Sequence, residues 1–217
     1  MRRALGIGLP ASVEQATRTF GSLVLMSLAA QFGTRALAAF GMGTRVMSLF
    51  FSPIMGLSIA TAAVVGQNIG ADRMDRAESA GRLYAWTGFG LLTALGLLML
   101  PIAPFLMQAM SPGDPEVAAG ATRFVRTFAP FLGLMAVPQV LLGVFRGAGS
   151  TRQSMAISLV MQWGFQLPAA WALAFLTSAG VAGVWWSYAV ANIAAAAIAI
   201  AWFLQGPWRR SLVAGGR

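Results

Sequence analysis

The sequence contains no cysteine, no histidine and no lysine in its 217 residues, and only six acidic residues. Without cysteine, the chain forms no disulfide and offers no thiolate to a metal ion. Without histidine, it lacks the side chain that most often titrates near neutral pH and the commonest metal ligand. Charged residues make up 10% of the chain, against about a quarter in soluble domains. We therefore predict no metal site and no cofactor, and nothing in the sequence indicates an enzyme.

Apolar residues dominate what is present, at 58% of the chain with a mean hydropathy of +0.72. The net charge of +9 comes entirely from arginine. Basic proteins often bind nucleic acid, but these arginines are scattered between apolar segments instead of forming one basic stretch. The composition favours a protein that lies in a lipid bilayer, and we predict no nucleic-acid partner.

Six apolar segments are long enough to cross a membrane. A bilayer core of about 30 Å needs roughly 20 helical residues at about 1.5 Å each. We therefore predict an all-α, polytopic membrane protein in which residues 1–217 form a single bundle of six transmembrane helices. The predicted helices span residues 9–32, 46–66, 83–107, 124–145, 154–176 and 181–204.

Glycine and proline divide these segments and also occur within them. Clusters of Gly, Pro, Ser or Asp at residues 31–34, 111–115, 147–150 and 177–180 are typical of turns. Proline kinks a helix by removing a backbone donor, and small residues let helices approach closely. We expect the first helix to open at Pro10, and breaks or close packing at Pro53, Gly56, Gly66, Gly70, Pro138 and Gly147.

The arginines are distributed unevenly over the two sides that six spans create. Cytoplasmic loops carry the excess of basic residues. Ten arginines fall on the side that holds both ends of the chain: Arg2, Arg3, Arg73, Arg76, Arg82, Arg146, Arg152, Arg209, Arg210 and Arg217. Four fall on the other side: Arg35, Arg45, Arg123 and Arg126. We expect a plasma (inner) membrane protein with both termini in the cytoplasm.

Glu14, Gln15 and Arg18 interrupt the first apolar segment. Glu14 and Arg18 are four residues apart, so they share a helix face and can pair. Charged groups at membrane depth usually face a bundle interior or an aqueous cavity. In one interpretation, Glu14 is a proton or cation site in a transport cavity. In the other, Glu14 lies in the first turns after Pro10, where the helix dipole favours an acid, and Arg18 reaches back to the headgroups.

Amide side chains lie within three of the later segments. They are candidates for contact with a transported molecule, although amides within membrane helices also hydrogen-bond neighbouring helices. Two of them are four residues apart and predict one polar stripe on the fifth helix. The candidates are Gln139, Gln162, Gln166 and Asn192.

Several segments resemble the multidrug and toxic compound extrusion (MATE) transporters, in the order in which that family carries them. The departure is Ser150, where the family usually has Asp. The segments are GLP at 8–10, FGTRALAA at 32–39, PIMGLSIA at 53–60, GQNIGA at 66–71 and FRGAGSTR at 145–152.

The resemblance implies an antiporter that expels cationic or amphipathic small molecules against entry of a proton or a sodium ion. Members have two six-helix lobes with the substrate cavity between them, and this chain resembles the C-terminal lobe. We expect it to need a partner, either an N-terminal lobe or a second copy. Three alternatives remain open: a half-size homodimeric transporter, a lipid or polysaccharide flippase of the same superfamily, and a non-transporting remnant or accessory membrane subunit.

Overall fold

The computed structural model describes the backbone of residues 2–206 and of residue 208. Over this range the chain forms six long helical stretches joined by short turns. Two of the stretches change helix type midway, so they carry three labels each. The elements are α1 (Arg2–Ala30), α2 (Thr34–Gly70), α3 (Met74–Met110), α4 (Pro115–Phe128), η1 (Ala129–Phe131), α5 (Leu132–Gly147), α6 (Thr151–Leu159), η2 (Val160–Gln166), α7 (Leu167–Phe175) and α8 (Val181–Gln205).

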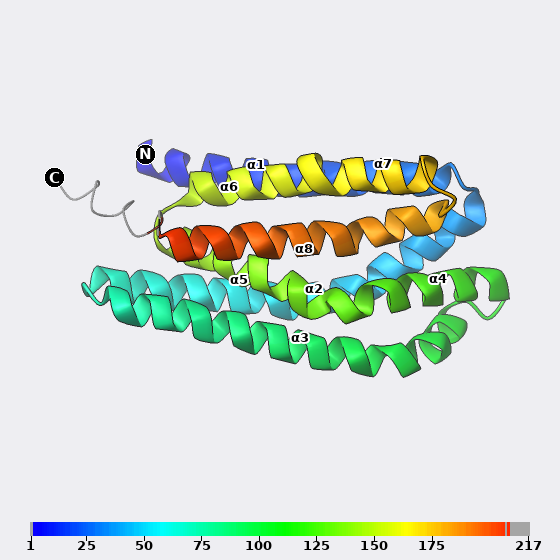
Figure 1. Ribbon diagram of the computed structural model, residues 1–217, viewed down its shortest axis with the longest axis horizontal. Coiled ribbons are helices and arrows are strands. Elements are labelled where there is room, and N and C mark those ends of the chain that lie inside the picture. Colours follow the sequence, from blue (N-terminus) through cyan, green and yellow to red (C-terminus); the bar gives the residue numbers. More distant parts are fainter. Residues whose placement is uncertain (1, 207, 209–217) are drawn as a thin grey trace.

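The stretches run back and forth along one long axis (Figure 1). The start of α1, the α2–α3 turn, the α5–α6 turn and the end of α8 lie at one end of the bundle. The α1–α2, α3–α4 and α7–α8 turns lie at the opposite end. This is the alternation expected of a chain that crosses a membrane repeatedly. The turns coincide with the predicted clusters at 31–34, 111–115, 147–150 and 177–180.

Four described stretches are long and apolar enough to cross a membrane: α2, α3, the run Pro115–Gly147, and α8. The chain is therefore an all-α, multi-pass membrane protein, while the count of six crossings remains a prediction. The predicted boundaries of the second and third helices are too short. Both α2 and α3 have 37 residues, about 55 Å of helix, which exceeds the thickness of a bilayer core.

These longer helices change where several arginines lie. Arg45 is within α2 and Arg123 is within α4, although both lie outside the predicted helices 46–66 and 124–145. Arg35 at the start of α2 pairs with Glu116 and, at 3.5 Å, with Asp114. Asp114 also caps α4 through its Oδ1 atom, which accepts from the backbone of Glu116 at 3.1 Å. The two turns at this end are thereby joined.

The predicted opening of the first helix at Pro10 is wrong. The helix α1 begins at Arg2 and continues through Pro10. Glu14 consequently lies about three turns inside α1, too far from its start for the helix dipole to act on it. The interpretation of Glu14 as a helix-start acid fails for this reason.

The helix type changes near two prolines of the apolar segments, and it does not change at Pro53 or Pro138. Helix α2 runs through Pro53 and α5 runs through Pro138 without interruption. The change from α4 to α5 occurs instead in η1, which contains Pro130. The π-helix η2 precedes Pro168, and the Leu167 backbone N–H donates to the Gln162 carbonyl, five residues back. A wider turn here relieves the clash that a proline ring makes with the preceding turn.

Helix α5 is the centre of the bundle, since most of its residues are buried. Gly147 lies against α2, where any added side chain would clash with the backbone of Ala62. Gly66 is also closely packed against α5, because an added Cβ would lie 3.3 Å from the Gly147 carbonyl oxygen. The expected close packing at Gly56 and Gly70 is wrong within this bundle. Both are exposed, and no described atom of a neighbouring element lies within 4 Å of an added Cβ.

Candidate functional site

Glu14 is held in a buried polar cluster where α1, α5 and α6 meet. Glu14 as a whole is 8% exposed. Its Oε1 atom accepts from Arg18 Nη2 at 3.1 Å and from Ser158 Oγ at 3.1 Å. Its Oε2 atom accepts from Ser154 Oγ at 3.3 Å. A buried carboxylate is tolerated only when it is paired and hydrogen-bonded, and these contacts meet that condition.

A second arginine approaches the same carboxylate. Arg146 Nη2 lies 3.8 Å from Glu14 Oε1, so two guanidinium groups share one acid. The Nε atom of Arg146 is buried and has no hydrogen-bond partner among the described residues. The cluster therefore carries more positive than negative charge at its centre.

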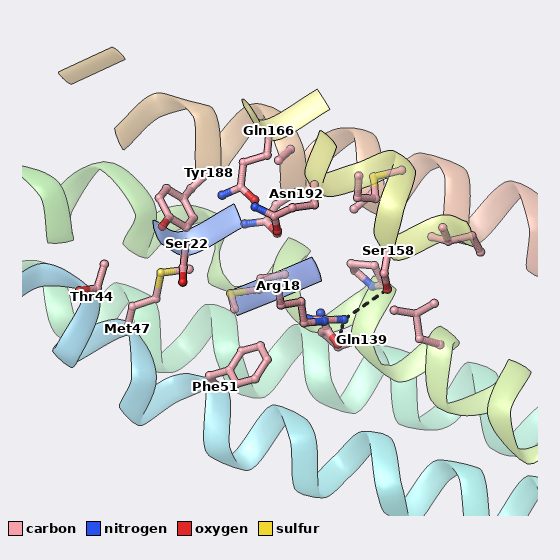
Figure 2. Close-up of a pocket in the computed structure, with 18 of the residues that line it drawn as sticks. Arg18, Ser22, Thr44, Met47, Phe51, Gln139, Ser158, Gln166, Tyr188 and Asn192 are labelled. Atoms are coloured by element: carbon pink, nitrogen blue, oxygen red, sulfur yellow. Dashed lines mark hydrogen bonds between the residues drawn. The ribbon is translucent and has the colours of Figure 1, made fainter. Parts of the chain in front are cut away.

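A pocket of ≈ 330 Å³ lies beside this cluster and is lined by α1, α2, α5, α6, η2 and α8 (Figure 2). Of the seven polar residues predicted for a transport cavity, the structure brings five to its wall: Arg18, Gln139, Gln162, Gln166 and Asn192. Figure 2 shows Gln166 and Asn192 facing the same space from one side, and Arg18 and Gln139 adjoining each other. Residues from four separate helical stretches thus converge on one pocket.

Glu14 and Gln15 are placed differently from that group. Glu14 lies behind Arg18 and does not line the pocket, and Gln15 is exposed on the surface of α1. Among the described lining residues, Arg18 is the one charged side chain. Its guanidinium also donates to the Gln139 amide oxygen at 3.3 Å. Arg18 therefore connects the pocket wall to the buried carboxylate.

Gln162 reaches the pocket because α1 carries a glycine opposite it. A Cβ added at Gly21 would overlap the Gln162 side chain. The π-helix η2 contains Gln162 and Gln166, and single π turns inside α-helices occur frequently at functional sites. The π-helical turn and the glycine on α1 together determine where the Gln162 side chain lies in the pocket wall.

Sequence reasoning missed part of this site. Ser154 and Ser158 bind Glu14, and a signal for them was available, since Ser154, Ser158, Gln162 and Gln166 recur every four residues. The apolar wall offered no such signal, because its residues are indistinguishable from those of any membrane helix. It includes Met47, Phe51, Met135, Leu142 and Met161.

Comparison with known proteins identifies the family. The MatE family model matches residues 10–172, three quarters of the chain. The chain belongs to the MatE family.

Over the described residues, no group of three or more acidic side chains comes together that would hold a metal ion.

Curated relatives agree with this assignment. A probable multidrug resistance protein NorM from Pseudomonas aeruginosa is 33% identical over 206 residues, covering 92% of this chain and 41% of the relative. A probable multidrug resistance protein YoeA from Bacillus subtilis is 26% identical, covering 96% of this chain and 45% of the relative. This MatE chain thus spans less than half the length of the curated relatives it matches.

The fold is that of solved MATE structures. A MATE crystal structure in the bent conformation superimposes with a TM-score of 0.89 at 22% identity, over 99% of this chain and 47% of that one. The arrangement of helices described above is therefore the arrangement of part of a solved MATE structure.

Proposed function

We propose that this chain is one lobe, the C-terminal one, of a cation-coupled multidrug efflux antiporter. The observation that carries the proposal is the link through Arg18, which lines the pocket and binds the buried Glu14 at 3.1 Å. A molecule in the pocket and an ion at Glu14 would both act on this one guanidinium. Such a shared contact is what coupling between two sites requires.

The pocket suits an amphipathic small molecule. Its apolar wall includes Met47, Phe51 and Met161, and its polar edge consists of amides and hydroxyls. Amide oxygens accept hydrogen bonds from a cationic amine, and aromatic faces attract cations. The ion pair with Glu14 at 3.1 Å reduces the positive charge that Arg18 presents to the pocket.

A proton is the coupling ion that this site favours over sodium. A sodium ion needs several oxygen ligands, whereas a proton needs one acceptor oxygen, and the described partners of Glu14 are two arginines and two serines with no second carboxylate. A proton instead neutralises Glu14, weakens its pairing with Arg18, and leaves Arg18 free to turn toward the pocket. Loss of the proton restores the pair.

A partner lobe is expected on the exposed face of α2. This face, which we call the α2 stripe, runs through consecutive turns of the helix and consists of small residues with one glutamine at its end. The pocket is also lined by α2, through residues 44–51, which precede the α2 stripe on the same helix. The stripe consists of Ser52, Gly56, Ala60, Ala63 and Gln67, all exposed.

The assembled transporter is proposed to lie in the plasma (inner) membrane with both termini cytoplasmic, because the arginine excess falls on their side. A flippase gains no support from the pocket, since Arg18 is its one described basic lining residue. A second copy of the chain remains a competing partner, because an exposed stripe of small residues also permits self-association.

Reconstitution of the purified chain in proteoliposomes, with and without a separately expressed N-terminal lobe of a relative, tests the proposal. An imposed proton gradient should drive export of an amphipathic fluorescent dye only when both lobes are present. Gradient-driven export by the chain alone as a monomer would contradict it. Export by the chain alone as a dimer would favour the homodimer instead.

A further inference from the structure

A second pocket of ≈ 360 Å³, which we call the outer groove, opens between α3, α5 and α8. Val137 and Leu141 of α5 are buried and form its floor. Trp86 of α3 and Leu204 of α8 form its sides and are 71% and 65% exposed. The outer groove shares no lining residue with the pocket beside Glu14. It therefore lies on the surface that a membrane-spanning bundle presents to lipid.

Among the described residues, one charged side chain lines the outer groove. Arg82 is the last charged residue of α3, since the rest of that helix to Met110 is uncharged. Its side chain is 59% exposed and contacts Glu78 at 3.1 Å, one turn earlier. A guanidinium carries five N–H donors, so this contact leaves donors for a further acceptor. The arginine is the exposed member of the pair, and ion pairs between residues four apart on a helix surface contribute little.

The order of side chains along the outer groove follows the order of groups in a phospholipid. Arg82 comes first, at the boundary between the charged residues 72–82 and the apolar part of α3. Trp86 lies one turn deeper and packs edge-on against Phe89, with ring centroids 5.8 Å apart. Tryptophan is enriched at headgroup level, where its ring is half wetted. Beyond it the groove is apolar, and from Arg82 to Phe89 it runs about 10 Å along the helix.

We propose that the outer groove binds an anionic phospholipid, with one acyl chain against Val137 and Leu141 and the phosphate of the headgroup on Arg82. Charge complementarity selects the headgroup, because arginine binds phosphate through paired N–H donors. The apolar floor of the groove favours an acyl chain. Because the groove lies on the lipid-facing surface, a phospholipid can enter it directly from the bilayer. This proposal does not depend on the transport activity proposed above.

The experiment measures phospholipid retained by the purified chain in a neutral detergent, using native mass spectrometry with equimolar phosphatidylglycerol and phosphatidylcholine of matched acyl chains. The wild-type chain should retain phosphatidylglycerol in preference, by about fivefold for one arginine at headgroup level. Arg82→Gln should abolish that preference. Ala85→Phe, which places a ring in the groove, should reduce retention of both lipids.

Arg76→Gln is the matched control, because Arg76 is an exposed arginine of α3 that does not line the groove, and it should keep the preference. Helical content by circular dichroism and a single elution peak establish that each variant is folded. Equal retention of the two lipids by the wild type, or an undiminished preference in Arg82→Gln, would overturn the proposal. Displacement of the lipid by soluble glycerol phosphate would also overturn it, since it would indicate an anion site without acyl-chain binding.

Discussion

Glu14 of α1 and Ser158 of α6 are joined by a hydrogen bond of 3.1 Å across 144 positions of sequence. Ser154, one turn earlier on α6, donates to the other oxygen of the same carboxylate. Arg18 completes the contact from the pocket side. The Glu14 carboxylate is thus held between two helices, and it forms an ion pair with Arg18 in the pocket wall.

The first prediction concerns the charge of Glu14. Glu14→Gln keeps the size of the side chain and an oxygen that accepts from the serines, but removes the charge that holds Arg18 and Arg146. In a two-lobe assembly, we expect proton-driven dye export to fall at least about tenfold, while the amount of protein in the membrane stays unchanged.

Gln15→Ala is the control, because Gln15 is the exposed neighbour of Glu14. It should leave export at the wild-type rate. Export that is equally fast in Glu14→Gln would remove Glu14 from the coupling mechanism.

The second prediction concerns the hydrogen bonds from α6. Ser158→Ala removes a donor to a buried carboxylate, and bonds to charged groups contribute about 1.5–3 kcal/mol. We expect a lower midpoint in a thermal unfolding assay of the detergent-solubilised chain. Ser27→Ala should leave the midpoint within error, since Ser27 is exposed and bonds only its own helix at Leu23. Equal midpoints for both variants would show that the α1–α6 contact adds no stability.

The third prediction compares two glycines of the family-like segments. Gly147→Leu introduces a side chain where α5 meets the Ala62 backbone, and overpacking of this kind costs about 1–3 kcal/mol or more. Gly70→Leu points into open space. Size-exclusion chromatography should show aggregation or loss of Gly147→Leu and a normal peak for Gly70→Leu. The reverse result would contradict the packing of α5 on α2.

The fourth prediction concerns the α2 stripe. Gly56→Trp should leave the isolated lobe folded, because Gly56 is exposed and unobstructed. It should reduce co-purification with an N-terminal lobe, since a large side chain keeps a partner helix away. Gly90→Trp, also exposed and unobstructed but on α3, is the control and should co-purify normally. If both variants co-purify as well as the wild type, the partner lobe does not bind through α2.

Membrane orientation gives a fifth prediction. Reporter fusions at the C-terminal end should report a cytoplasmic location, and fusions in the turn between α3 and α4 should report the opposite side. The arginine excess is the reason, because basic residues are retained on the cytoplasmic side. A C-terminal reporter on the outer side would contradict the predicted orientation.

The sequence by itself determined the class of the protein and the places of its turns. Hydrophobic runs of membrane length and clusters of breaker residues act locally, so the joints at 111–115 and 177–180 are evident without a structure. The same local rules fail at the first helix, where they predict a start at Pro10. Proline fits the first turn well, but neighbouring elements allow a helix to continue through it.

Only the tertiary structure decided which polar residues act together. Glu14, Arg146 and Ser158 lie on three elements, and no local pattern places them within hydrogen-bonding or ion-pair distance. The roles of the glycines were likewise decided by what lies opposite them. Gly147 faces the backbone of α2, whereas Gly56 faces open space, although both sit in similar small-residue patterns. Burial and pairing depend on neighbours far away in sequence, and only the packing of the helices supplies those neighbours.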